Sequence, residues 1–177
     1  MKATPKILVI LLALGLAACT RPQPGTTTVL LVRHGEKASE AEDSPLTEAG
    51  QQRAQALVRV AEDAGVSAVY SSQFKRNLDT ARPLSEHLGI AVTQIPVNPS
   101  SLSDYGKSLA VDILGKHRGQ TVVVVGHSNT LAATVESLIG RPARIDSVEY
   151  HDLFVVSVPP TGTATVIKAE YGARVGR

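Results

Sequence analysis

Two strongly apolar runs in this sequence each end at a histidine. The run VLLV leads directly into Arg33 and His34, and the run TVVVV leads, after one glycine, into His127. A third apolar stretch ends a few residues before Arg76. Such runs predict buried strands, and open α/β sheets bind their ligands at strand ends. Two arginines and two histidines gathered there would suit a doubly charged anion, and a phosphoryl group is the obvious candidate.

The sequence lacks the motifs of other enzymes that transfer phosphoryl groups. The sequence has no G-x-x-x-x-G-K-[ST] loop and no G-x-S-x-G elbow. Its five histidines are scattered without metal-ligand spacing, so we expect no metal site. The single cysteine, Cys19, lies in a segment with another explanation, given below. Histidine itself is therefore the expected nucleophile, assisted by arginine.

The apolar pattern predicts strands that alternate with helices. Strands are expected at 29–32, 67–72, 90–95, 121–125, 153–158 and 163–169. The last two are joined by a Pro- and Gly-containing turn, which indicates an antiparallel pair. This order predicts an α/β fold, a three-layer α/β/α sandwich around a mainly parallel sheet with an antiparallel edge.

Four helices are expected between these strands. Thr47 can cap the first, and Pro83 should kink or interrupt the second before it stops at Gly89. Ser103 or Asp104 can cap the third, and the fourth should run over about 129–139.

Four motifs resemble those of the histidine phosphatase (phosphoglycerate-mutase-like) superfamily. They are LVRHGE, PLTEAG, YSSQFKR followed by TA, and VGHS, in the expected order over residues 29–130. The resemblance implies that His34 is the nucleophile and that Arg33 and Arg76 bind the phosphoryl oxygens, together with His127. Ser128 would be either a phosphate contact or a helix cap. The resemblance implies no metal and no organic cofactor.

The proton donor for the leaving group is less clearly marked. Many members of the superfamily take this acid from a glutamate after the third strand, but residues 96–103 contain no carboxylate. Asp104 is the first acid beyond that segment, and Glu36 is nearer to the nucleophile in sequence. Asp104, Glu36 and the absence of any donor therefore stay open. Absence would favour leaving groups that need little protonation, such as those of a phosphohistidine or an acyl phosphate.

The N-terminal segment predicts export. Lys2 and Lys6 precede an apolar stretch that is short for a membrane span and closes as LAAC at Cys19. This resembles the lipobox of bacterial lipoproteins. We expect a signal peptide at 1–18, a lipidated Cys19 with a flexible tether over 19–28, and a phosphatase domain at 29–177. The acyl chains would hold the protein in a bilayer on the periplasmic side of the envelope, at the outer rather than the inner membrane.

Charge and size narrow the function classes. Lys2 and Lys6 supply the whole excess of 18 basic over 16 acidic residues, so nothing indicates nucleic-acid binding. The short loops at 37–45 and 96–103 favour an open pocket for a small or glycan-borne phosphate ester. The alternatives are a phosphate- or phosphoglycan-binding module on the same fold and a phosphohistidine phosphatase acting on proteins. A mutase is less favoured, because the short chain offers little enclosure for a bisphosphorylated intermediate.

Overall fold

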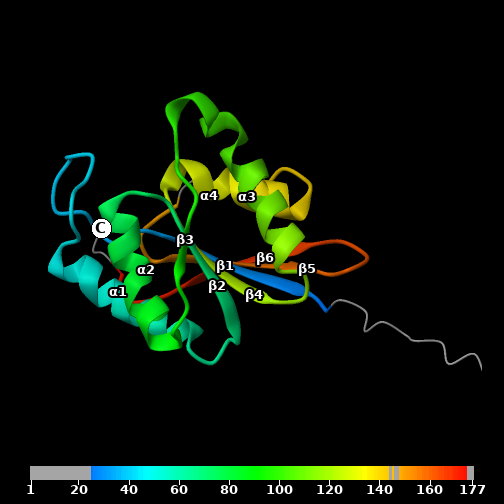
Figure 1. Cartoon of the computed structure of the whole chain (residues 1–177), viewed down its shortest axis with the longest axis horizontal. Helices are drawn as coiled ribbons and strands as arrows, with labels where there is room; N and C mark the ends of the chain where they lie inside the picture. Colours follow the sequence, from blue (N-terminus) through cyan, green and yellow to red (C-terminus); the bar gives the residue numbers. More distant parts are fainter. Residues whose placement is uncertain (1–24, 144, 146–147, 175–177) are drawn as a thin grey trace, which may run out of the picture.

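The computed structural model describes residues 25–143, 145 and 148–174, and strands and helices alternate along it (Figure 1). The strands are β1 (Thr27–Arg33), β2 (Val66–Ser71), β3 (Val92–Gln94), β4 (Thr121–Gly126), β5 (Asp152–Val158) and β6 (Thr165–Glu170). The helices are α1 (Glu48–Ala61), α2 (Lys75–Leu88), α3 (Leu102–Lys116) and α4 (Ser128–Ile139), with a 3-10 turn η1 (Pro99–Ser101). The predicted α/β class is confirmed.

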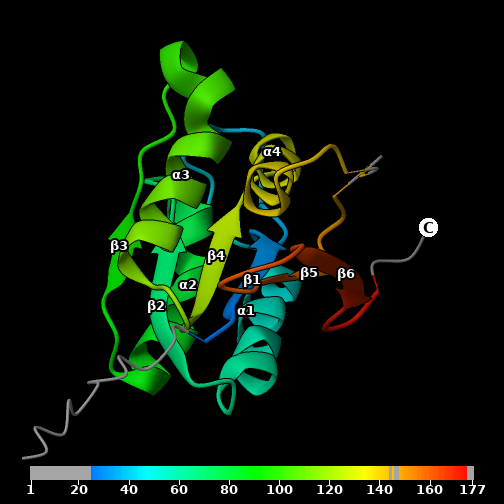
Figure 2. The ribbon, with the colours of Figure 1, turned by 90° about the vertical axis from the view of Figure 1, so that its right-hand side faces the viewer.

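One six-stranded sheet runs through the molecule in the order β3-β2-β4-β1-β5-β6 (Figure 2). The first four strands in this order are parallel to one another. β5 is antiparallel to β1, and β6 is antiparallel to β5. The predicted mainly parallel sheet with an antiparallel edge is therefore what the structure contains.

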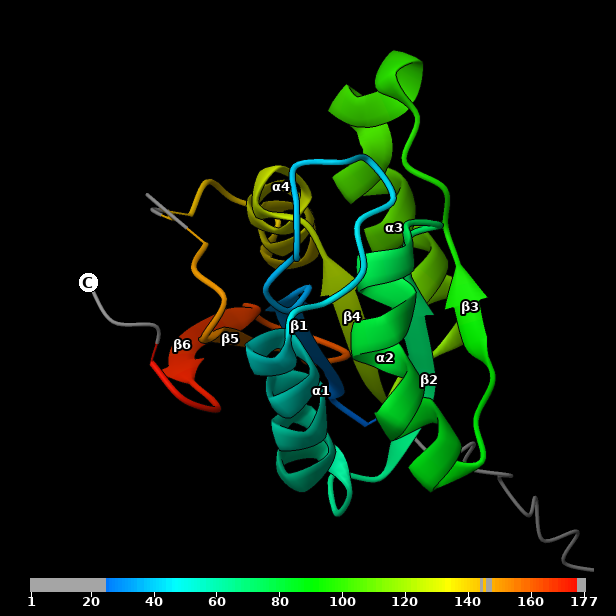
Figure 3. The same cartoon turned by 90° about the vertical axis from the view of Figure 1, so that its left-hand side faces the viewer.

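Helices cover both faces of the sheet: α1 and α2 pack on one face, and α3 and α4 pack on the other (Figures 2 and 3). Successive residues of β1 point to opposite faces, so Val29 and Leu31 join the core under α3 and α4. Leu30 and Val32 join the core under α1 and α2. Burial on both sides explains why this strand is apolar without alternation.

Capping residues end the helices where the sequence indicates. The Thr47 side chain accepts a hydrogen bond from the Gly50 N–H at 3.1 Å and caps the start of α1. Gly89 and Gly140 follow α2 and α4 with φ of 67° and 69°, in the left-handed region that favours glycine.

Three boundary predictions were wrong in detail. Pro83 lies inside a continuous α2, because the buried Ala81 and Leu84 hold that helix on the sheet against a proline cost of about 3 kcal/mol. β3 pairs with β2 over only three residues, since it is an exposed edge. The N-cap of α3 is Ser101, not Ser103 or Asp104, because the turn begun by Pro99 delivers a chain that is already helical.

The predicted signal peptide at 1–18 and Cys19 lie outside the described residues. Within the part of the chain that is described, no helix is long and apolar enough to cross a membrane.

Candidate active site

The carboxyl ends of β1 and β4 are locked together at one edge of the sheet. Arg33 is the register partner of Gly126, and the His34 N–H donates to the Gly126 carbonyl at 3.0 Å. The buried Asn77 amide at the start of α2 donates to the carbonyls of Val125 and Gly126, each at 3.1 Å. These bonds fix the distance between the two histidine-bearing strand ends.

His34 is buried beneath this edge with a defined tautomer. Its Nδ1 is 2.8 Å from the Gly35 carbonyl oxygen, which can only accept, so Nδ1 carries the proton. Its Nε2 accepts from the Arg76 Nε–H at 3.2 Å. Burial, followed by the charges of Arg76 and Arg33, lowers the pKa of His34 to about 4 against the opposing bond to Gly35. At neutral pH His34 thus keeps a lone pair on Nε2.

The loop that carries His34 is fixed by close backbone contact with α1. The Gly35 N–H donates to Thr80 Oγ1 at 2.8 Å. A Cβ on Gly35 would lie 2.8 Å from the Gly50 carbonyl oxygen, and one on Gly50 would lie 2.6 Å from the Glu36 oxygen. Both positions therefore require glycine for approach rather than for an unusual φ.

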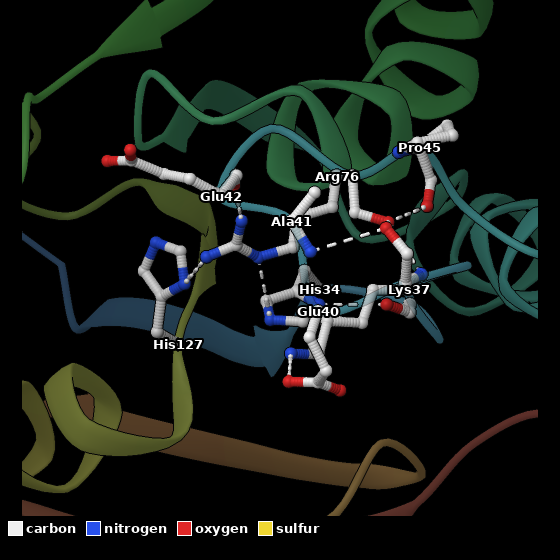
Figure 4. Close-up of polar contacts among 11 residues, drawn as sticks. His34, Lys37, Glu40, Ala41, Glu42, Pro45, Arg76 and His127 are labelled. Carbon is white, nitrogen blue, oxygen red and sulfur yellow. Dashed lines mark hydrogen bonds and ion pairs between the residues drawn. The ribbon is translucent and has the colours of Figure 1, made fainter.

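Arg76 lies between the two histidines (Figure 4). Besides the bond to His34, its Nη2 is 3.4 Å from His127 Nδ1, and its Nη1 donates to the Glu42 carbonyl at 2.5 Å. The 37–45 loop thus reaches over the site and meets the first turn of α2 (Figures 3 and 4).

His127 is the N-cap residue of α4 and is also buried. Its Nε2 is 2.8 Å from Ser72 Oγ, and its Nδ1 faces Arg76. Since the arginine donates to Nδ1, the proton of neutral His127 belongs on Nε2 and is donated to Ser72. Burial, then the charges of His34, Arg76 and Arg33, lower the pKa of His127 to about 3.

Arg33 also lies near the site, because the Tyr150 ring that it stacks on has its centre 5.8 Å from that of the His34 ring. Its Nη1 donates to the Val148 carbonyl at 3.0 Å, and its guanidinium lies 4.0 Å from the centre of the Tyr150 ring. Two guanidinium groups, two imidazoles and the N-terminus of α4 therefore converge at one place. This arrangement can neutralise a phosphoryl group and offers a nucleophilic nitrogen beside it.

The two candidate proton donors and Ser128 are placed differently. Glu36 forms a largely buried ion pair with Arg53 at 2.6 Å. Burial raises the pKa of Glu36, but the hydrogen bonds and charge of Arg53 outweigh it, so the carboxyl is an acid too strong to hold a proton at neutral pH. Asp104 is exposed on α3, and no hydrogen bond or ion pair among the described residues joins it to the site. Ser128 is exposed as the first residue of α4, so the cap is His127 instead.

Some residues of the site were not predicted from the sequence. Asn77 directly follows the YSSQFKR motif and is fully buried, but nothing in the sequence marks it as part of the site. Phe74 stacks beneath Arg76, with the guanidinium 4.6 Å from the ring centre. Tyr150 is far in sequence from every motif. Its only distinction in the sequence is that aromatic residues are rare, at 3% of the chain. No group of three or more His, Cys, Asp or Glu able to hold a metal ion occurs within the residues described.

Comparison with known proteins agrees with this geometry. Residues 29–97 match the model of the histidine phosphatase superfamily (branch 1). The sequence has no match among curated proteins.

Solved structures share the fold. A mycobacterial glucosyl-3-phosphoglycerate phosphatase is 17% identical at a TM-score of 0.62, over 75% of this chain and 90% of that one. A phosphoserine phosphatase from Entamoeba histolytica, in complex with 3-phosphoglyceric acid, is 16% identical at a TM-score of 0.64, over 84% of this chain and 98% of that one. A protein described as mycobacterial hydrolase 2 is 15% identical at a TM-score of 0.66, over 85% of this chain and 94% of that one. The segment that is similar to this superfamily contains Arg33, His34 and Arg76, and the likeness to the solved structures is one of fold.

Proposed function

We propose that the protein is a metal-independent phosphatase that hydrolyses phosphomonoesters through a phosphohistidine intermediate. One observation carries the proposal: the buried His34 is neutral, with its Nδ1 proton held by the Gly35 carbonyl and its Nε2 lone pair facing Arg76. A nucleophile needs that free electron pair, and a fixed tautomer presents it without rearrangement of the ring.

In the first step the Nε2 lone pair of His34 forms a bond to phosphorus. The phosphorus–oxygen bond to the leaving group breaks in line, and the leaving oxygen takes that bond's electron pair and then a proton from solvent. In the second step water attacks phosphorus and gives up a proton to solvent, the nitrogen–phosphorus bond breaks, and its electron pair returns to His34. The products are the alcohol or phenol and inorganic phosphate.

Charge stabilisation in both steps comes from groups already on the site. Arg76 would exchange its two histidine contacts for phosphoryl oxygens, and Arg33 would bind the same group. A bound dianion raises the pKa of His127, so its Nδ1 gains a proton to donate to the same oxygens. Backbone N–H groups at the start of α4 add a favourable dipole.

The substrate that these features support is a small or glycan-borne phosphate ester. The mycobacterial and Entamoeba neighbours are phosphatases whose names refer to phosphorylated small molecules, which supports phosphatase activity here. The N-terminal sequence supports an exported lipoprotein anchored through Cys19 on the periplasmic face of the envelope, at the outer membrane. A phosphorylated envelope glycan or sugar is the substrate class that fits both features.

A second candidate is a phosphohistidine phosphatase acting on proteins. It is favoured by the ion pair between Glu36 and Arg53 and by the exposed place of Asp104, which leave neither carboxyl beside His34. The imidazole of a phosphohistidine substrate can leave without much help from an acid, whereas the alkoxide of an alkyl phosphate cannot. Activity on phosphohistidine without activity on alkyl phosphates would mark this alternative.

The test is hydrolysis of an aryl phosphate by full-length protein purified in detergent, with and without EDTA. An aryl leaving group needs little protonation, so the assay tests the nucleophile alone. We expect EDTA-resistant turnover that falls by at least about a thousandfold in His34→Ala and persists in His87→Ala, a control at the exposed end of α2. Folded protein that binds phosphate without turnover would instead indicate a binding module.

A further inference from the structure

Four aromatic rings form a row across the site: Phe74, His127, His34 and Tyr150. Their consecutive centroids are 5.3, 5.4 and 5.8 Å apart. Each terminal ring supports one arginine, with Arg76 over Phe74 and Arg33 over Tyr150. Since the chain has only two Phe, four Tyr and no Trp, one third of its Phe and Tyr residues stand in this row.

We propose that Tyr150 is a positioning residue, whose ring holds the Arg33 guanidinium in the orientation needed to bind the phosphoryl group. This inference rests on the proposed function. Tyr150 lies outside the segment that matches the superfamily model, and it comes from the turn before β5 rather than from a motif strand.

Arg33 depends on this turn for its orientation. Its Nη1 donates to the Val148 carbonyl, and two residues later the Tyr150 ring lies 4.0 Å below the guanidinium. A cation this close to a ring face lies well inside the range of a cation–π contact. The Arg33 Nε is buried and has no partner within the described structure. The two contacts therefore fix the plane of the group without using all its donors.

The turn that presents Tyr150 is itself fixed. The Glu149 N–H donates to Asp152 Oδ2 at 2.7 Å, and the Asp152 N–H donates to the Glu149 carbonyl at 3.3 Å. Asp152 is 1% exposed and its carboxylate also pairs with Lys168 at 2.9 Å. A rigid turn keeps the ring in place before substrate arrives, which reduces the entropy cost of ordering Arg33 on binding.

Two substitutions separate the role of the Tyr150 ring from that of its hydroxyl. Tyr150→Phe retains the ring, so we expect kcat/KM for an aryl phosphate to stay within about twofold of wild type. Tyr150→Leu removes the ring face, and we expect kcat/KM to fall about tenfold, the effect of losing one partly desolvated cation–π contact. Inhibition by vanadate should weaken in parallel. Glu149→Ala, at an exposed neighbour in the same turn, is the control for damage to the turn.

A double-mutant cycle tests whether Tyr150 acts through Arg33. In an Arg33→Gln background we expect Tyr150→Leu to lower kcat/KM by less than twofold, because the group that it positions is absent. Thermal melts confirm that each variant is folded. If wild-type protein shows no turnover, the proposed function fails, and the same cycle is measured as inorganic phosphate affinity by calorimetry.

Three results would overturn the inference while leaving the phosphatase intact. The first is Tyr150→Leu with wild-type kcat/KM. The second is an equal loss with and without Arg33. The third is a loss of kcat/KM in Tyr150→Phe as large as in Tyr150→Leu. If that loss were confined to alkyl phosphates, it would indicate that the hydroxyl is a proton donor instead.

Discussion

Both ring nitrogens of His34 and of His127 already have polar partners before any ligand binds. Arg76 contacts one nitrogen of each ring. In the proposed mechanism a phosphoryl group would displace that arginine from both imidazoles, and the Nε2 lone pair of His34 would be freed only when the arginine has phosphoryl oxygens to bind. At the residue scale, Arg76 would thus couple binding of the anion to exposure of the nucleophile.

The lowered pKa values of the two histidines predict how stability depends on pH. An unfolded chain binds protons at its histidines near pH 6.5, whereas folded His34 and His127 bind them only near 4 and 3. The unfolded state therefore holds more protons between these values, and stability falls as the pH is lowered through that window. Each histidine contributes at most about 1.4 kcal/mol per pH unit.

Chemical denaturation at pH 7, 6 and 5 measures this effect. We expect the free energy of unfolding to decline across the series and to decline less in His127→Gln, which cannot take up the proton. A wild-type protein whose stability is flat from pH 7 to 5 would show that the two imidazoles are not desolvated in the folded state.

Arg33, His34, Arg76 and His127 could be brought together from the sequence, because strand ends of a parallel sheet converge whatever the details of packing. Tyr150 could not, since its contact with Arg33 joins residues 117 positions apart and depends on a turn held by Asp152. Nor could the commitment of Glu36 to Arg53 be predicted, because an ion pair between a loop and a helix face has no local pattern.

At the scale of elements, the loop that carries His34 contacts α1 directly through backbone atoms. A Cβ at Gly50 would lie 2.6 Å from the Glu36 carbonyl oxygen and 2.9 Å from the Glu36 nitrogen, with no flexible side chain to yield. We expect Gly50→Ala to cost about 1–3 kcal/mol of stability and to lower kcat/KM more than tenfold, since the shifted loop carries His34.

The control is Gly115→Ala in α3, where an added Cβ meets nothing within 4 Å. That change should be neutral or stabilise by up to about 1 kcal/mol. Urea denaturation and aryl phosphate turnover of both variants measure the difference. A Gly50→Ala protein with native stability and activity would show that the two elements are not packed this closely.

Elements with strong local signals were also the ones that could be predicted best. Thr47 begins α1 and Gly89 ends α2 by capping, which depends only on neighbours in sequence. Pro83 was misjudged because its penalty is local, whereas the burial of Leu84 that offsets it comes from the sheet. The short β3 was overestimated for the converse reason, because only β2 is available to pair with it.

At the scale of the whole molecule, we expect Cys19→Ser to move the protein from the membrane to the soluble fraction, because a seryl residue cannot carry the thioether-linked lipid. Specific activity on an aryl phosphate should be unchanged, since Cys19 precedes the folded domain. Fractionation with Thr20→Ser as control checks the prediction. Retention of the serine variant in membranes would contradict anchoring through residue 19.

The direction of β1 has a consequence for what such an anchored enzyme could reach. This strand begins at Thr27, near the start of the described residues, and ends six residues later at Arg33 in the site. At about 3.3 Å per residue, Thr27 and Arg33 lie about 20 Å apart, at opposite ends of the strand. In a chain anchored at its start, the site would therefore lie at the end of the domain away from the anchor. Phosphates carried by diffusing molecules or by glycans that project from the surface would reach that end more readily than phosphates on headgroups of the protein's own leaflet.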